Sequence, residues 1–524
     1  AGAPFLQGMF SMSNHSEYLN NVLLSRVYDV AVETPLDEAV SLSRRLGNRV
    51  LLKRDDLQPV FSFKLRGAYN KMARLSPEEL RRGVIAASAG NHAQGVALAA
   101  RRLGCEAVIV MPVTTPAIKV DAVRRLGGQV VLFGESFSDA WRHTLDLIKE
   151  TGYVFIPPFD DPDVIAGQGT IGMEILRQHP DPIHAIFVPI GGGGLAAGVA
   201  AYVKNLRPEI RVIGVEPVDS DAMRRSIMAG HRVELKDVGL FADGVAVKLV
   251  GEETFALCRD LLDDIITVDT DAICGAIKDI FEDTRVVAEP AGALALAGLR
   301  AYARAGNLRD TTLVAVVSGA NMNFDRLSHV AERARFGANR EALLGVTIPE
   351  KAGSFRQLVQ AISSRNITEL CTRFADPVNA HVLVGIDIKN SDEVASVLED
   401  LRAAGFSACD LTDNELAKLH LRHMVGGNAP QVHNERLIRF FFPERPGALL
   451  NFMDAMRVTY NFTLFQYRYH GADFGRVLLG VEVPEERRED FEEFLARVDR
   501  MGYPHVDETD NPAYKMFLGW HHDN

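Results

Sequence analysis

The side chain in this 524-residue chain whose surroundings most clearly indicate chemical reactivity is that of Lys64, which lies between Phe63 and Leu65. An ammonium group in apolar surroundings is poorly hydrated, which lowers its pKa and makes it a competent nucleophile or Schiff-base former. A lysine in such a stretch is more often a solvated surface charge. The residues around Lys64 do not by themselves decide between the two interpretations.

Two other segments combine small residues with the expected start of a helix. They are Ser88 to His92 and the four glycines that precede Leu195. Unpaired N–H groups at a helix start attract carboxylates and phosphates, and glycines let the backbone curve around an anion. The glycines match neither the dinucleotide fingerprint nor the Walker loop, so a phosphate cradle is favoured there. Taken alone, Ser88 to His92 is more simply a helix N-cap.

The composition excludes several classes of protein. The chain has 57 Lys and Arg against 69 Asp and Glu, so it lacks the basic surplus of a nucleic-acid binder. No apolar run reaches the roughly 18 residues that a membrane span needs. The five cysteines form no CxxC pair, which indicates reduced thiols in a cytosolic protein.

From about residue 50 to residue 335, short apolar runs alternate with helical patterns. Continuously apolar strands separated by helices indicate α/β architecture, with parallel sheets covered on both faces and ligands bound beyond the carboxyl ends of the strands. Ser318 directly follows the last expected strand and alone indicates a turn. Strands are expected at 84–87, 107–111, 130–133, 185–188, 212–215 and 313–317, and helices at 92–103, 117–126 and 195–206.

The remainder of the chain contains an internal repeat. Residues 343–362 match residues 437–456 at an offset of 94, and one inserted residue then makes the offset 95. Each copy carries a Pro-Glu-x-x-Gly turn, which begins at Pro349 and at Pro443. The expected order in each copy is strand, turn, helix, two strands, helix and strand, which predicts two ferredoxin-like β-α-β-β-α-β units.

The order of these segments resembles that of the fold type II pyridoxal-phosphate enzymes, and within them the threonine dehydratases. The resemblance covers residues 17–335 as a catalytic domain with two open parallel-sheet subdomains. The repeat is similar to the paired ACT-like regulatory domains of the biosynthetic members. The family's motifs are matched by residues 62–68, 88–92, 167–170 (Gly-Gln-Gly-Thr), 191–195, 288–292 (Ala-Glu-Pro-Ala-Gly) and 318–321.

The resemblance implies roles for individual residues. Lys64 would hold pyridoxal 5'-phosphate as a Schiff base and remove the α-proton of the substrate, with Phe63 packing at the ring. Asn91 would meet the ring hydroxyl, and Ser318 the pyridine nitrogen, where a neutral hydroxyl favours loss of the β-substituent over transamination. The cofactor phosphate would lie on Gly191, Gly192, Gly193, Gly194 and Leu195, and the substrate carboxylate on Ser88, Ala89, Gly90, Asn91 and His92.

The implied activity is the deamination of L-threonine to 2-oxobutanoate and ammonia, the first committed step of isoleucine biosynthesis, with L-serine converted to pyruvate. L-isoleucine would inhibit the enzyme and L-valine would antagonise that inhibition. Glu350 and Glu444 are candidate partners for the effector's ammonium group, and Phe355 and Leu449 for its branched side chain. The resemblance also implies a homotetramer in the cytoplasm.

The expected domain organisation follows from the motifs and the repeat. Residues 1–16 are expected to be disordered or left over from cloning, and residues 17–335 form the catalytic domain. The two ACT-like domains are expected at 342–413 and 437–510, with a linker at 414–436 and a tail at 511–524.

Three alternatives stay open. Some relatives bind a cation near the positions of Glu216 to Ala222, but Ala222 stands where an acidic ligand is expected, so a solvated loop is favoured and no metal is assigned. A synthase of the same fold would differ around the catalytic lysine. An amino-acid sensor with an inactive catalytic domain would not need Lys64 and Ser318.

Overall fold

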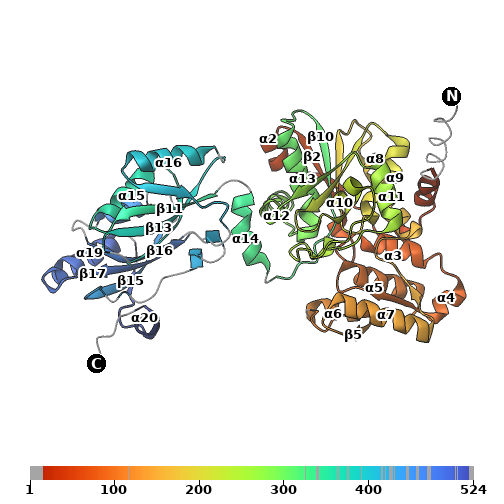
Figure 1. The fold of residues 1–524 in the computed structure, drawn as a ribbon, viewed down its shortest axis with the longest axis horizontal. Helices are drawn as coiled ribbons and strands as arrows, with labels where there is room; N and C mark the ends of the chain where they lie inside the picture. The colour runs from red at the N-terminus through yellow and green to blue at the C-terminus, as the bar shows by residue number, and fades with distance from the viewer. Residues whose placement is uncertain are drawn as a thin grey trace. The chain divides into compact units, whose positions relative to one another are not determined.

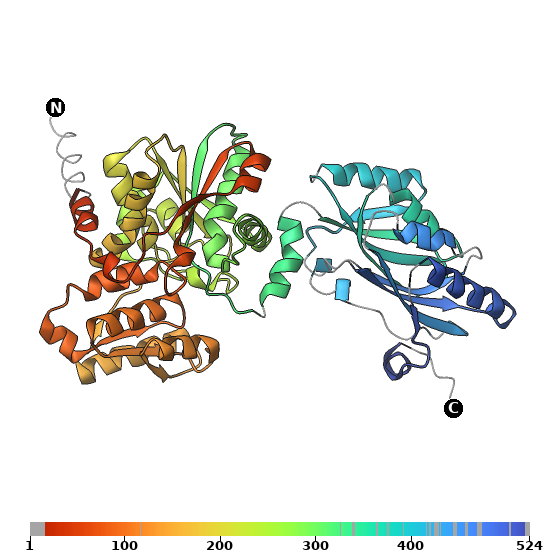
Figure 2. The same cartoon turned by 180° about the vertical axis from the view of Figure 1, so that it is seen from behind.

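The chain divides into two compact units, residues 1–337 and 338–524, each with its own hydrophobic core (Figures 1 and 2). The computed structural model describes residues 16–115, 117–324, 326–337, 341–362, 365–374, 377–390, 392–414, 417–418, 421–423, 429, 431–443, 448–455, 460–468, 474–501, 503 and 505–518. Among these residues, no helix is long and apolar enough to span a bilayer.

The larger sheet of the first unit has the strand order β1-β2-β10-β7-β8-β9 and is parallel except for β1. Successive residues of β2 point to opposite faces, as strand geometry requires. Leu52 therefore packs with α2, α12 and α13, whereas Leu51 packs with α8 and α9. The bounds are β1 (Leu36–Glu38), α2 (Val40–Leu46), β2 (Arg49–Arg54), α8 (Pro162–Gln178), β7 (Ala185–Pro189), α9 (Gly194–Leu206), β8 (Arg211–Pro217), α10 (Ala222–Ala229), α11 (Glu252–Leu261), β9 (Asp264–Val268), α12 (Thr270–Thr284), α13 (Pro290–Ala305), β10 (Thr312–Val317) and α14 (Arg326–Gly337).

The smaller sheet of the first unit has the order β5-β4-β3-β6 and is entirely parallel. Helices α3, α5 and α6 pack on one face, and α7 packs on the other. Figure 1 shows α5, α6 and α7 around the smaller sheet, with α3 lying toward the helices of the larger one. The bounds are α3 (Lys64–Met72), α4 (Pro77–Arg82), β3 (Val84–Ala87), α5 (Asn91–Leu103), β4 (Ala107–Met111), α6 (Ala117–Arg125), β5 (Gln129–Leu132), α7 (Phe137–Thr151) and β6 (Val154–Phe155).

The predicted α/β architecture is confirmed. All six expected strands are present as β3, β4, β5, β7, β8 and β10, and the three expected helices as α5, α6 and α9, with ends within two residues of the prediction. The sequence pattern did not indicate β1, β6 or β9, which lie at the edges of the two sheets, nor β2, which lies inside the larger sheet between β1 and β10.

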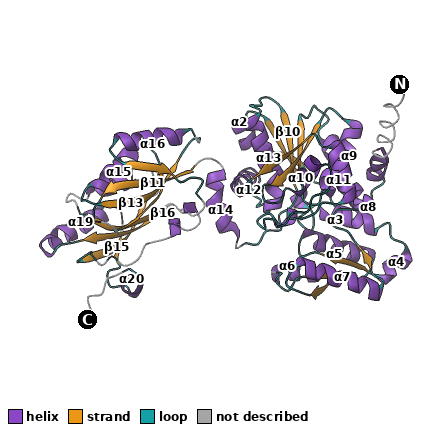
Figure 3. Ribbon diagram, viewed as in Figure 1, coloured by secondary structure: helices purple, strands orange, loops and turns teal. Residues whose placement is uncertain are grey.

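The second unit is one eight-stranded antiparallel sheet with the order β14-β11-β13-β12-β16-β17-β15-β18. Each copy of the repeat supplies four strands in the order predicted for a ferredoxin-like unit, which confirms that prediction (Figure 3). The first copy has β11 (Glu341–Pro349), α15 (Ser354–Ile362), β12 (Ile367–Arg373), β13 (Asn379–Asp387), α16 (Glu393–Ala403) and β14 (Ser407–Asp410). The second has β15 (Glu435–Pro443), α18 (Ala448–Ala455), β16 (Phe462–Arg468), β17 (Phe474–Glu482), α19 (Arg488–Arg500) and β18 (His505–Asp507).

The two copies join edge to edge through antiparallel pairing of β12 with β16. Arg373 of β12 also crosses between the copies, because its guanidinium donates to the carboxylate of Glu435 at 2.5 Å. Tyr514 donates to the same carboxylate at 2.7 Å. The last described helix, α20 (Pro512–Phe517), is therefore tied to the second copy of the repeat.

Several predicted segments differ in extent or lie outside the described residues. The second copy begins with β15 at Glu435, inside the segment expected as a linker, and the expected tail contains α20. Residues 16–23 are helical, and residue 16 belongs to the expected N-terminal segment. Residues 1–15, Glu444 and residues 519–524 lie outside the described residues.

Candidate active site

Lys64 is the first residue of α3, and its side chain is largely removed from water. Its Nζ donates a hydrogen bond to the carbonyl oxygen of Pro158 at 2.7 Å and lies 5.3 Å from the ring centroid of Phe63. Burial lowers the pKa of the Lys64 ammonium to about 8. In a fraction of the molecules Lys64 is therefore a neutral amine near neutral pH, as expected for an ammonium group with apolar neighbours.

Buried ion pairs hold α3 in place behind Lys64. Arg66, which is fully buried, donates to Asp55 at 2.8 Å and to Glu174 of α8 at 2.6 Å. Lys53 of β2 pairs with the same Glu174 at 2.6 Å. Because removing one partner of a buried pair leaves an uncompensated charge, this network strongly disfavours displacement of α3.

Backbone hydrogen bonds place Lys64 beside the end of β10. Ser62 forms an isolated antiparallel bridge with Gly319, and the N–H of Phe63 donates to the carbonyl oxygen of Ser318 at 3.1 Å. The Ser318 hydroxyl is buried and donates to the carbonyl oxygen of Ala291 at 3.4 Å. The predicted lysine and serine are therefore neighbours, although 254 positions separate them in the chain.

The segment from Ser88 to His92 forms the turn between β3 and the start of α5. A Cβ atom at Gly90 would meet nothing within 4 Å, so open space lies in front of this turn. His92 is buried, and its Nε2 lies 2.8 Å from the carbonyl oxygen of Ile156. Burial, together with the nearby charge of Lys64, lowers the pKa of His92 to about 3. The imidazole is therefore neutral at neutral pH and is a poor proton acceptor.

Asn91 connects this turn to the larger sheet. Its Nδ2 donates to Glu289 Oε1 at 2.6 Å, and its Oδ1 accepts from Asn321 Nδ2 at 2.8 Å. Sequence reasoning did not assign Asn321 or Glu289 to the site. The signals were present, because both residues lie within the motifs that carry the family resemblance.

The tetraglycine loop has the tight backbone that a phosphate cradle needs. Gly193 has a φ of +98°, a conformation that favours glycine. A Cβ atom at Gly192 would lie 2.2 Å from the ring of Phe159. Since Phe159 directly follows Pro158, the residue that accepts from Lys64, this loop lies close to the amine. The N–H groups at the start of α9 follow the loop and can bind an anion.

Glu216 lies in β8, so the solvated-loop interpretation is wrong for this residue, whereas Asp219 is exposed in the turn that follows. Its carboxylate is fully buried and accepts from the backbone N–H groups of Met223 and Arg224, both at 2.9 Å. The side chain thus satisfies the first turn of α10. Burial raises the pKa of the Glu216 carboxyl to about 8. Residue pattern alone could not reveal this, because the acceptor and its donors become neighbours only when the chain turns.

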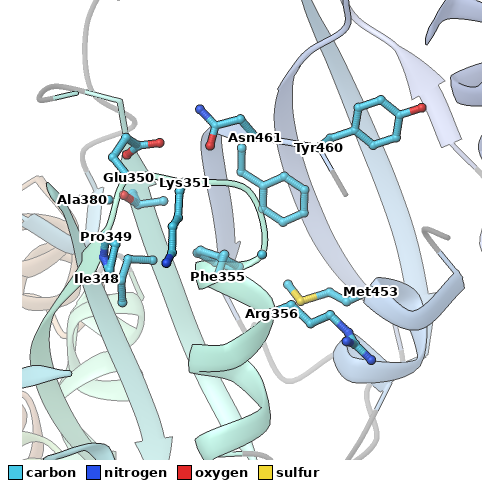
Figure 4. A pocket seen from close by; sticks show the side chains of 13 residues that line it. Ile348, Pro349, Glu350, Lys351, Phe355, Arg356, Ala380, Met453, Tyr460 and Asn461 are labelled. Carbon is cyan, nitrogen blue, oxygen red and sulfur yellow. The ribbon is translucent and has the colours of Figure 1, made fainter. Parts of the chain in front are cut away.

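The second unit contains a separate pocket between the two copies of the repeat (Figure 4). The predicted residues Glu350 and Phe355 both line it, and the Phe355 ring packs 4.7 Å from that of Phe465. Leu449 is buried in the shared core and does not line this pocket. The other lining residues are Ile348, Pro349, Lys351, Gly353, Arg356, Thr372 and Ala380 of the first copy, and Met453, Tyr460, Asn461 and Phe462 of the second.

Comparison with known proteins accounts for both units. A family described as pyridoxal-phosphate dependent enzymes matches residues 27–319, and the C-terminal regulatory domain of threonine dehydratase matches residues 332–421 and 426–518. The L-threonine dehydratase biosynthetic IlvA of Burkholderia multivorans is 59% identical and covers 97% of this chain and 100% of its own. The IlvA of Escherichia coli K12 is 52% identical, covering 96% and 97%.

The chain belongs to the biosynthetic threonine dehydratase family. Among solved structures, the processed form of threonine deaminase isoform 2 from Solanum lycopersicum matches with a TM-score of 0.61 and 56% identity, over 62% of this chain and 88% of that one. The T.th. threonine deaminase matches with a TM-score of 0.55 and 41% identity, over 59% of this chain and 98% of that one.

The family's cofactor is pyridoxal 5'-phosphate, and the residues present fit that group. Lys64 provides an amine with a lowered pKa. The tetraglycine loop provides a backbone that a phosphate can approach, and a Cβ atom at any of its glycines would contact neighbouring atoms. The buried Ser318 offers a neutral hydroxyl.

Replacing Lys64 with alanine is expected to lower threonine turnover by at least about a thousandfold while leaving the fold intact, because Lys64 alone combines the Schiff-base amine with the proton acceptor. Steady-state turnover and far-UV circular dichroism measure the two effects. Lys71→Ala on the same helix is the control, since Lys71 pairs with Asp161 and does not contact Lys64. Near-normal turnover by Lys64→Ala with cofactor bound would refute the assignment.

Replacing Gly193 with valine is expected to weaken cofactor binding by about tenfold or more. The new Cβ would lie 2.6 Å from Met223 and 2.9 Å from Thr254, on a backbone with positive φ. Gly230→Val is the matched control, because Gly230 also has positive φ (+74°) but has nothing within 4 Å of its Cβ position. Titration of cofactor into the cofactor-free variants distinguishes them, and equal affinities would place the phosphate elsewhere.

Proposed function

We propose that the first unit deaminates L-threonine to 2-oxobutanoate and ammonia, with Lys64 as the amine that holds the cofactor and moves the α-proton. The observation that carries the proposal is the desolvated Lys64 amine, hydrogen-bonded to Pro158 beside the tetraglycine loop. When bound, pyridoxal 5'-phosphate withdraws electrons from the substrate's α-carbon. A nearby neutral amine can then take the α-proton, which a permanently protonated arginine could not do.

The other residues orient the substrate and limit side reactions. The turn from Ser88 to His92 presents the start of α5 to open space, which suits the substrate carboxylate. His92 remains neutral and adds no competing base. Ser318 is an uncharged partner for the pyridine nitrogen, so the site favours loss of the β-hydroxyl over transamination. L-serine carries the same β-hydroxyl, so we expect it to yield pyruvate.

We further propose that the second unit senses branched-chain amino acids, with L-isoleucine as inhibitor and L-valine as its antagonist. The pocket between the two copies supports this proposal, since it combines the acidic Glu350 with the apolar rings of Phe355 and Phe462. An amino acid with a branched side chain has a matching ammonium group and apolar end. A homotetramer and a cytosolic location complete the proposal, and the five free thiols suit a reducing compartment.

A chain that ends near residue 336 is expected to deaminate threonine without responding to isoleucine, whereas the full chain is inhibited. The first unit has its own core, and the T.th. threonine deaminase is matched over 98% of its length by 59% of this chain. A coupling of roughly 1–3 kcal/mol would change the apparent threonine affinity roughly 5- to 150-fold. Threonine saturation at several isoleucine concentrations measures it. Equal sensitivity in both chains would place the effector site in the first unit.

A point variant separates loss of the effector site from loss of the whole unit. Glu350→Gln in the full chain should raise the isoleucine concentration for half-inhibition about tenfold, because an ion pair with the ammonium group is lost. Glu485→Gln is the control, since Glu485 is exposed in the second copy and does not line the pocket.

A further inference from the structure

Three side chains form a continuous hydrogen-bonded chain at the centre of the first unit. Glu289 precedes α13, Asn91 begins α5, and Asn321 follows β10. The Asn91 amide lies between the other two, with its Nδ2 2.6 Å from Glu289 Oε1 and its Oδ1 2.8 Å from Asn321 Nδ2. These hydrogen bonds therefore connect the smaller sheet of this unit with the larger one.

The two partners determine which way the Asn91 amide faces. In its ionised form the Glu289 carboxylate can only accept hydrogen bonds, and in that form it selects the NH₂ end of Asn91. Asn321 donates to the opposite end, and its own orientation is set because its Nδ2 also donates to the carbonyl oxygen of Val60 at 2.8 Å. One N–H of Asn91 remains, and it has no partner among the residues that the structure describes.

The side chain of Glu289 is buried and held in place by its neighbours. It is only 4% exposed, and its own N–H donates to the carbonyl oxygen of Gly319 at 3.1 Å. A Cβ atom at Gly319 would lie 2.4 Å from Glu289 Oε1, so this glycine leaves room for the carboxylate. Burial, reinforced by the charge of Asp243 and opposed by Lys119 and the hydrogen bonds, raises the pKa of Glu289 to about 7.

We propose that Glu289 is a positioning residue, which with Asn321 holds the Asn91 amide so that its remaining N–H faces the ring oxygen of the bound cofactor. The proposal rests on the proposed placement of the cofactor between Lys64 and Asn91. A donor at the ring oxygen stabilises its anionic form, so the orientation of this amide affects both the affinity and the electronic state of the cofactor.

Glu289→Gln tests the proposal because it preserves shape while making the network inconsistent. The backbone N–H of Asn321 also faces the Glu289 carboxylate and opposes the rise of its pKa. If the new amide accepts from Asn91 with its oxygen, its NH₂ group faces the N–H of Asn321. If it turns over, its NH₂ group faces that of Asn91, which must then turn toward Asn321 and place two donors together. Either arrangement places two donors together, at Asn321 in the first case and at Asn91 in the second, so the network that fixes the Asn91 amide is weakened.

The matched control is Glu216→Gln. Glu216 is a second buried carboxyl of the same unit, and its pKa is also raised. It accepts two backbone N–H groups at the start of α10 and does not contact Asn91 through a hydrogen bond. Any general effect of neutralising a buried carboxylate should appear in both variants. Asn321→Ala provides an independent variant should Glu289→Gln fail to fold, and it is expected to produce the same changes to a smaller degree.

The experiment titrates pyridoxal 5'-phosphate into each cofactor-free protein and records the absorption spectrum of the bound cofactor. For Glu289→Gln we expect a dissociation constant roughly 10- to 100-fold higher, as for loss of a hydrogen bond to a charged group. We also expect a shift of absorbance from the visible band toward the near-ultraviolet. Glu216→Gln should match the native protein in both respects.

Asn91→Ala distinguishes failure of this inference from failure of the site on which it rests. If Asn91→Ala alters affinity and spectrum while Glu289→Gln matches the native protein, the positioning role is overturned and the site stands. Equal losses in Glu289→Gln and Glu216→Gln overturn it as well, because they indicate a general structural effect. A native spectrum and affinity in Asn91→Ala overturn the cofactor placement itself.

Discussion

The hydrogen bonds around Gly319 are the constraint on which the first unit's site depends. The peptide groups of residues 318–320 pair with those of residues 61–63, and the carbonyl oxygen of Gly319 also accepts from Glu289. These backbone hydrogen bonds join the residue before α3, the end of β10 and the start of α13. A Cβ atom at Gly292 would lie 2.0 Å from the Gly319 carbonyl oxygen, so the approach is possible only for glycine. Displacing any one of these segments would separate Lys64 from Ser318.

Burial then gives the assembled groups their chemistry. Lys64 and His92 both lose hydration in the same region, and for a basic group desolvation favours the neutral form. Burial also favours the neutral form of the Glu289 carboxyl, but because this group is an acid the effect raises its pKa. The site thus contains an amine, an imidazole and a carboxyl whose charges are all weakened, while the ion pairs of Arg66 that hold α3 lie outside it. The ion pairs that position α3 therefore come from other residues than the three whose charge is weakened.

The sequence predicted much of the fold because its signals are local. Apolar runs and small-residue turns located the parallel strands, and the matched turns at Pro349 and Pro443 revealed the repeat. What it missed depends on contacts that form only when the chain turns or distant segments meet. Nothing near Glu216 indicates that its carboxylate folds back onto α10, and nothing near Pro158 indicates that its carbonyl oxygen meets Lys64. The joining of the two repeats through β12 and β16 likewise depends on which strand edges remain free after each copy has folded.

The central claim is that Lys64 is a desolvated amine, and the pH dependence of its own reactivity tests this most directly. In cofactor-free protein, the rate at which an acylating reagent modifies Lys64 can be followed across pH by mass spectrometry of the peptide that contains it. Because only the neutral amine reacts, the rate should rise through a midpoint near the pKa of about 8, well below the value of roughly 10.4 for a lysine in a model peptide, which a reference peptide in the same reaction provides. A Lys64 midpoint that coincides with that of the reference peptide would contradict the account.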